Sequence, residues 1–257
     1  MHDFPGMLRS LDCLHWAWAC SPNPHKGQYT RGDHGYPTVI LEAVASQDMW
    51  ICHAFFGSVG SLNDINVLNM SPLLDDMYNG TAPDSSFQVA GTSYRNRYYL
   101  VDGIYLEHAY FVKSLSCLND WKRLKFKRAQ ERARNDVERA FGALKKRWHI
   151  LKYLASYMEE KKMSEVMYTC IILHNMILED EGNTICEYNE NEIVPPTQAF
   201  EVGSAEYTSR RALVNDVGTH HVLRRDLMER IWNVNHIDLN TEPVSDLEGQ
   251  FSDEDVL

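Results

Sequence analysis

The chain has 257 residues, 44% of them hydrophobic and 24% charged, which is typical of a globular protein with a buried core. Its six cysteines show no paired spacing, and its longest apolar run, residues 168–178, is short and interrupted, so a disulfide scaffold and a membrane span are both excluded. The net charge of −11 argues on average against a nucleic-acid partner, but bases and acids are segregated. Twelve Lys and Arg against three acids leave +9 between residues 121 and 152, whereas residues 179–206 and 238–257 contain acids and no bases.

The N-terminal part of the chain is typical of β-structure. Residues 7–16 form a strand-like run that contains a carboxylate, Asp12. Residues 38–45 and 50–56 are rich in β-branched and aromatic residues and flank a turn at 46–48. The pattern predicts that the sheet begins with three antiparallel strands.

The next segments read as connections. Residues 21–35 are rich in proline and glycine and predict a loop, in which Lys26 and Arg31 are either solvated or in contact with phosphate. Asp64 follows in the stretch GSLNDIN, where an acid serves either as a helix N-cap or as a neighbour of a metal site. Residues 71–86 are polar and turn-rich and predict a surface connection.

A second strand–acid pattern precedes a long helix. The apolar run at residues 97–101 ends on Asp102 and a glycine, which predicts a buried strand with a carboxylate at its C-terminal end. Residues 118–154 have helical periodicity with an apolar stripe centred on Val137. Glu138 falls about 100° from Val137 around the helix, so we expect it at the rim of the packed face.

The polar face of this long helix is basic. One interpretation is a solvated helix with i,i+4 pairs such as Arg134–Glu138. Twelve bases cannot be neutralised by three acids, however, and lysine and arginine contacts to phosphate give salt-dependent DNA binding. We expect the DNA backbone to be contacted by Lys122, Lys125, Arg128, Arg132, Arg139 and Lys146.

Residues 164–178 predict a further helix with buried positions at helical spacing. Within it, His174 and Asn175 read as a buried hydrogen-bonded pair, with a catalytic pair as the alternative. The chain after this helix is expected to divide into an acidic, disordered linker, a C-terminal helix and an acidic, disordered tail. The expected boundaries are a main domain at 1–180, the linker at 181–208, the helix at 209–235 and the tail at 236–257.

Asp12, Asp102 and Glu138 together suggest a metal site, because carboxylate oxygens are the ligands that Mg²⁺ and Mn²⁺ prefer. Two such ions, about 3.5–4 Å apart, can activate a water and stabilise the leaving oxygen of a phosphodiester. Among 36 acids, three will also look arranged by chance.

Five stretches decide between these interpretations. They read SLDCLHW, KGQYTRGDHGYPTVILEAVASQDMWICHAFFGSVGSLNDINVLNMSPL, YYLVDGIY, RNDVERAFGALKKRW and YTCIILHNMILEDE. In this order they resemble the plant PIF/Harbinger transposase-derived proteins, which are DDE superfamily endonucleases. The resemblance covers residues 4–181 and, more weakly, 210–232. It implies an α/β fold with a ribonuclease H-like mixed sheet flanked by helices, and a location in the nucleus. It also implies a Mg²⁺ or Mn²⁺ site formed by Asp12, Asp102 and Glu138, with Asp64 beside it.

The sequence departs from the family in two places. After Asp102 the family has a proline and a tryptophan where this chain has Leu106 and His108, so the change lies in the loop and not in the acids. Members also carry a helix-turn-helix-like region ahead of the first strand. Since none precedes Phe4 here, we expect a nuclear protein partner to supply site-specific DNA binding.

Two functions are therefore expected as alternatives. The first is a metal-dependent DNA endonuclease that hydrolyses phosphodiester bonds. The second is a domesticated, catalytically silent relative that acts as a nuclear DNA- or chromatin-interaction protein. No membrane partner is expected.

Overall fold

The computed structural model describes six ranges of the chain, which are residues 3–32, 35–79, 86–115, 120–151, 159–182 and 200–234. The tail expected at 236–257 and most of the expected linker lie outside the described residues.

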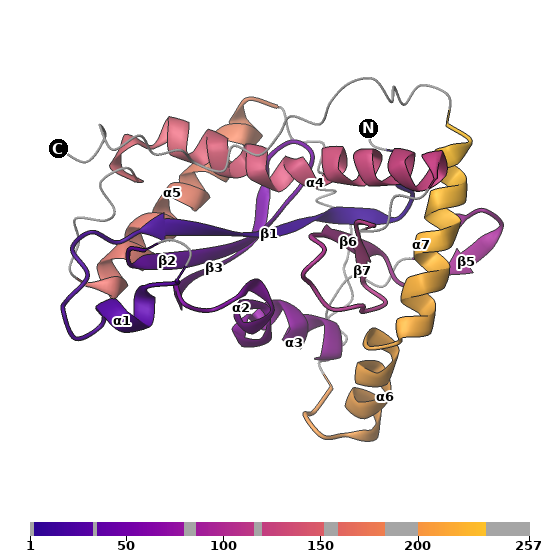
Figure 1. Ribbon diagram of the computed structural model, residues 1–257, viewed down its shortest axis with the longest axis horizontal. Coiled ribbons are helices and arrows are strands. Elements are labelled where there is room, and N and C mark those ends of the chain that lie inside the picture. The colour runs from indigo at the N-terminus through magenta and orange to yellow at the C-terminus, as the bar shows by residue number, and fades with distance from the viewer. Residues whose placement is uncertain are drawn as a thin grey trace.

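A five-stranded mixed sheet forms the centre of the molecule (Figure 1), with the strand order β3-β2-β1-β6-β7. The strands are β1 (Met7–Ala17), β2 (Thr38–Ala45), β3 (Ile51–Val59), β6 (Tyr98–Val101) and β7 (Phe111–Lys113). The first three pair antiparallel, whereas β6 pairs parallel with both β1 and β7. All eight residues of β2 are buried, as its place between two strands and two helical layers requires. The expected α/β architecture with an antiparallel start is confirmed.

Helices cover both faces of this sheet (Figure 1). One face carries α4 (Trp121–Arg147) and α5 (Glu160–Asp180), and the other carries α2 (Asp64–Met70) and α3 (Pro72–Asn79). Strand side chains alternate between the two faces. Leu11 therefore packs on the α2–α3 side, while its neighbours in β1 face α4. A two-stranded ribbon, β4 (Phe87–Val89) and β5 (Thr92–Tyr94), lies outside the main sheet.

Three expectations about the connections were wrong. The segment expected to be a polar connection after residue 71 contains α3, because Leu73, Leu74 and Met77 repeat on one face and are buried. A four-residue helix, α1 (Lys26–Tyr29), interrupts the loop expected at 21–35, since the Tyr29 ring packs into the core. The long helix ends at Arg147, not at residue 154.

The C-terminal segment also differs from expectation. Two helices replace the single one, α6 (Ala205–Val214) and α7 (Val217–Trp232). They are separated because the Asp216 side chain accepts a hydrogen bond from the Gly218 amide at 2.9 Å and caps α7. Since α6 begins at Ala205, it starts inside the range assigned to the linker.

The α7 helix is part of the core and not an appendage. Its Leu223, Leu227 and Ile231 are fully buried in the same cluster as Phe126 of α4. Figure 1 shows α7 crossing the end of the sheet beside β7 and β5. None of the helices in the described ranges has the length and apolar character that crossing a membrane requires.

Candidate active site

The parallel pairing of β1 with β6 sets two of the predicted acids side by side. The backbone register of these two strands pairs Ser10 with Leu100. Continued by two residues, it places Asp12 opposite Asp102, on strands that lie about 4.8 Å apart. Asp12 remains within β1, whereas Asp102 directly follows the last residue of β6 and is exposed. The register thus brings the main chain of Asp12 and that of Asp102 side by side where two neighbouring strands run in the same direction.

The α4 helix brings the third acid to this end of the sheet. The Ser10 hydroxyl donates a hydrogen bond of 2.9 Å to the Ala133 carbonyl. The buried Gln130 amide donates to the carbonyls of Val101 (2.9 Å) and Val112 (3.2 Å), at the ends of β6 and β7. These contacts fix α4 across the strand ends, and its next turn carries Glu138. The Glu138 side chain is 40% exposed, at the rim of the packed face as expected.

Arg134 joins two of the acids. Its Nη1 donates to Oδ2 of Asp12 at 2.6 Å, and its Nη2 donates to Oε1 of Glu138 at 2.9 Å. The Arg134 and Asp12 side chains are only 14% and 16% exposed, so water screens this interaction weakly. The sequence indicated the Arg134–Glu138 pair through its i,i+4 spacing. No local spacing indicated Asp12, which is 122 positions away.

The acids around Arg134 lie close enough together for their negative charges to change one another's pKa values. Burial raises the pKa of Asp12 to about 7, with further raising contributions from Asp64 and Glu138; Arg134 and the Cys13 amide lower it but do not cancel the effect of burial. Burial opposes the charge of Arg134, but the surrounding acids, Asp12 first and then Glu138 and Asp102, raise its pKa on balance. Asp12 therefore carries a proton at a pH at which an exposed aspartate would be fully ionised.

Asp64 lies close to this group but does not cap its helix. The N-cap of α2 is Asn63, whose side chain accepts a hydrogen bond from the Asn66 amide at 2.9 Å, and Asp64 is the first helical residue. The N-cap alternative for Asp64 is therefore wrong. Burial raises the pKa of Asp64, Arg31 lowers it and Asp102 raises it, which places Asp64 within electrostatic reach of the acids.

Sequence reasoning missed Glu42, another acid near the group. It is fully buried on β2 and pairs across the sheet with Cys13. His53 contacts its Oε1 at 3.2 Å. The sequence did contain a signal for Glu42, because it is the charged residue within the apolar run at residues 38–45.

The three predicted acids do not form one compact ligand set. Among the described residues, Asp12, Asp102 and Glu138 do not bring one oxygen each within 4.8 Å of one another. The guanidinium of Arg134 lies between Asp12 and Glu138 instead. Asp12 and Asp102 are neighbours through the strand register, and Glu138 is linked to Asp12 through Arg134.

Of the six α4 residues predicted to contact the DNA backbone, two have partners on or just after α7. Lys125 is 7% exposed, and its ammonium donates to the carbonyls of Trp232 (3.1 Å) and Val234, so its assignment to the DNA backbone is corrected. Lys122 forms an ion pair with Glu229 of α7. Of the remaining four, Arg128 is half-buried, and the exposed residues are Arg132, Arg139 and Lys146. These three repeat every seven residues and share one face of the helix.

A cleft of about 610 Å³ opens beside Asp102, between α4, α7 and the loop after β6. Several bases line it, including two from the C-terminal helix that sequence reasoning did not connect with the site. These bases are Lys113, Arg123, Lys127, Arg224 and Arg225. Asp102 is therefore the candidate acid most open to a phosphate-bearing molecule.

His174 and Asn175 lie on α5, against the edge strand β3. The His174 ring is fully buried and contacts the Met49 carbonyl through Nε2 at 3.0 Å. The Asn175 amide accepts from the Ile51 N–H at 3.0 Å and donates to the Ile51 carbonyl at 2.7 Å. The prediction that both residues are hydrogen-bonded inside the fold is confirmed, although only His174 is fully buried and Asn175 is half-buried.

The family described as "Plant transposon protein" has a model that matches residues 1–185. This chain belongs to that family. The match contains the sheet, α4, α5 and the candidate acids, and it ends before α6 and α7. No curated protein and no solved structure matches the chain.

Proposed function

We propose that this plant transposon protein is a metal-dependent DNA endonuclease of PIF/Harbinger descent, with a ribonuclease H-like nuclease domain. The sheet order supports the fold assignment, because an antiparallel β1–β2–β3 unit followed by parallel β6 and β7 is the arrangement expected of that fold. The family match supports the transposon origin.

The observation that carries the proposal is the convergence of acids at one end of the sheet. Asp12 and Asp102 are neighbours through the β1–β6 register, and α4 brings Glu138 to the same end of the sheet, where Arg134 links it to Asp12. The donor set fits a divalent cation, since all three are hard oxygen ligands. The raised pKa of Asp12 also fits, because added positive charge would relieve the crowding that raises it.

Asp12, Asp102 and Glu138 would hold Mg²⁺ or Mn²⁺, and Arg134 would release Asp12 as the cation takes its place. When bound, such ions supply an activated water and a stabilised leaving oxygen for phosphodiester hydrolysis. The chain's own groups would bind and orient the substrate. Asp12 would lose its proton, and the bases of the cleft would hold DNA phosphates beside Asp102.

A plasmid-nicking assay in Mg²⁺ or Mn²⁺ tests the proposal. The wild-type chain should convert supercoiled plasmid to nicked circles, and Asp102→Asn should reduce the rate on the order of a hundredfold. Asp180→Asn is the matched control, because Asp180 is exposed at the far end of α5. Equal cutting by wild type and Asp102→Asn, or no cutting by either, would refute the nuclease.

The DNA surface of α4 can be tested separately. Changing Arg132, Arg139 and Lys146 to Gln together should weaken DNA binding and lower its salt slope by about three. Lys161→Gln is the control, since Lys161 is exposed on α5. An unchanged salt slope in the triple variant would place the DNA elsewhere.

The alternative is a catalytically silent relative that binds DNA or chromatin in the nucleus, with or without a protein partner. The observation that favours it is Arg134, whose single positive charge already pairs with two of the three acids. This alternative predicts DNA binding that is unaffected by Asp102→Asn and by removal of divalent cations, together with no nicking.

A further inference from the structure

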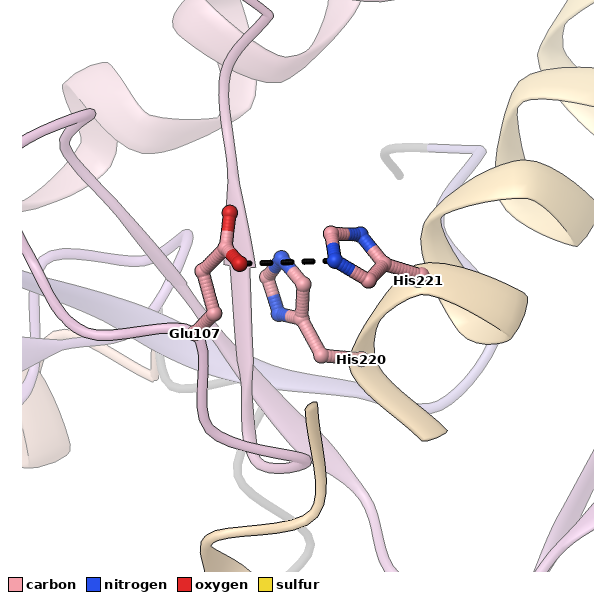
Figure 2. Close-up of side chains that lie close together, drawn as sticks. All are labelled: Glu107, His220 and His221. Atoms are coloured by element: carbon pink, nitrogen blue, oxygen red, sulfur yellow. Dashed lines mark ion pairs between the residues drawn. The ribbon is translucent and has the colours of Figure 1, made fainter. Parts of the chain in front are cut away.

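A second cluster of metal-ligating side chains lies at the cleft that Asp102 also lines (Figure 2). It consists of Glu107, in the loop between β6 and β7, and His220 and His221, in the first turns of α7. One ligand atom from each lies within 4.8 Å of the other two. Among the described residues, it is the group of three His, Cys, Asp or Glu side chains whose ligand atoms all lie this close together.

His220 is already oriented as a metal-binding histidine. Its ring is fully buried, and Nδ1 contacts the carbonyls of Phe111 at 2.8 Å and His108 at 3.2 Å. A proton on Nδ1 that is donated to these carbonyls leaves the lone pair on Nε2. Metal-binding histidines are held in this way, by a backbone carbonyl on the other ring nitrogen.

The Nε2 atom of His220 has no hydrogen-bond partner among the described residues, although it is buried. Figure 2 shows that this nitrogen, the one farther from the main chain, points toward the line that joins Glu107 to His221. Buried polar atoms nearly always have a partner in folded proteins. An unpartnered nitrogen that faces a carboxylate and a second imidazole is therefore evidence for a ligand.

The other two ligands have the spacing of a zinc site. Oε2 of Glu107 lies 3.4 Å from Nε2 of His221. In a tetrahedral zinc site with metal–ligand bonds of about 2.0–2.1 Å, neighbouring ligand atoms are about 3.3–3.4 Å apart. Two imidazoles and one carboxylate are a ligand set that zinc enzymes use, with the fourth position open.

We propose that Glu107, His220 and His221 bind one Zn²⁺ ion that holds α7 against the loop between β6 and β7. Glu107 and His221 are partly exposed, so the ion's fourth position faces the cleft beside Asp102. The ion would link the segment matched by the family model to a helix outside it.

One neighbour competes with the ion. Nη2 of Arg224 lies 3.1 Å from Nδ1 of His221 and donates to it, which favours a proton on Nε2. Zinc binding moves that proton to Nδ1 and releases Arg224. Both side chains are exposed at this point, so the guanidinium can turn into water or toward the cleft.

Zinc titration of the chelator-treated full chain, in excess Mg²⁺ so that hard-oxygen sites are filled, tests the proposal. The wild type should bind one equivalent, and replacing zinc with Co²⁺ should give the visible absorption of a four-coordinate imidazole site. Glu107→Gln and His221→Ala should each weaken binding on the order of a hundredfold. His25→Ala, which replaces an exposed histidine at the start of α1, should bind zinc as the wild type does.

His220 needs a variant that still folds. His220→Asn keeps a donor near the position of Nδ1, for the Phe111 carbonyl, and removes Nε2. It should retain the circular dichroism of the wild type and lose the zinc site. The proposal is overturned if the wild type binds no zinc, or if Glu107→Gln and His221→Ala bind it unchanged. Neither outcome bears on nicking by the acids around Asp12, so this inference and the nuclease proposal fail independently.

Discussion

Two regions bury polar side chains against the same face of the sheet, and they do so in opposite ways. At the α5–β3 junction, His174 and Asn175 have a hydrogen-bond partner for each of their polar side-chain atoms. At the α4–β1 junction, Asp12 and Glu138 share a single cation, Arg134, with further acids nearby. The first arrangement is one that stabilises a fold. The second leaves negative charge that only an added cation would balance, which is typical of a binding site.

The two regions also respond to pH in opposite directions. Burial lowers the pKa of His174; the Met49 carbonyl raises it and Arg147 lowers it, and burial prevails. Its contribution to stability is therefore present above about pH 6.5 and is lost as the pH falls. The raised pKa of Asp12 has the reverse consequence. The contribution of Asp12 to the stability of the fold is present below about pH 4 and is lost as the pH rises through about 7.

Arg134→Met should have the largest effect. It leaves Asp12 and Glu138 without their cation and should lower the free energy of unfolding by about 3–5 kcal/mol at neutral or higher pH. The loss should shrink near pH 5, because Asp12 is then protonated. Urea unfolding at both pH values measures this, with Arg132→Met, an exposed arginine on the same helix, as the control. A loss that is equal at both pH values would contradict the electrostatic account.

His174→Ala should come next, with a loss of about 2–4 kcal/mol, because it opens a cavity, leaves the Met49 carbonyl without its imidazole partner and removes one of the contacts of Arg147. Thermal unfolding followed by circular dichroism measures this. His149→Ala is the control, since His149 is exposed in the turn after α4. The variant should also lose less stability than the wild type between about pH 7 and pH 5, because one buried histidine no longer has to charge.

Asp12→Asn should have a smaller effect of the opposite sign. It removes a buried charge and should raise the free energy of unfolding by about 1–2 kcal/mol near pH 8. The gain should shrink as the pH falls and vanish below about pH 4, where Asp12 is neutral in both the folded and the unfolded chain. A destabilised variant near pH 8 would mean that the ion pair with Arg134 outweighs the cost of burying Asp12.

The smallest effect expected is the pH dependence of cation binding. Since a proton competes with the ion at Asp12, Mn²⁺ affinity should fall about tenfold for each pH unit below about 7. The rise in melting temperature produced by Mn²⁺, followed from pH 8 to pH 5, measures this. Asp180→Asn, at an exposed position of α5, should keep the same pH dependence, whereas Asp12→Asn should abolish it.

Much of the secondary structure could be predicted from local patterns in the sequence. The strands β1, β2, β3 and β6 follow from alternation and β-branched runs, and α4 and α5 from periods near 3.6. The segment at 72–79 was misread because its polar and turn-forming residues outnumber the three that are buried. Lys125 was misassigned because the helical pattern shows which face is polar and not that α7 would cover part of it.

The sequence by itself determined the family, the three candidate acids and most of the strands and helices, because periodicity and motifs are local properties of the chain. Only the tertiary structure decided that Asp12 lies beside Asp102, since parallel pairing joins strands about 90 residues apart through backbone register. It also decided that Arg134 bridges Asp12 and Glu138, and that α7 brings two histidines to Glu107. The contacts between different elements depend on how helices pack against a sheet, and no spacing along the chain encodes them; only the Arg134–Glu138 pair has a local i,i+4 spacing.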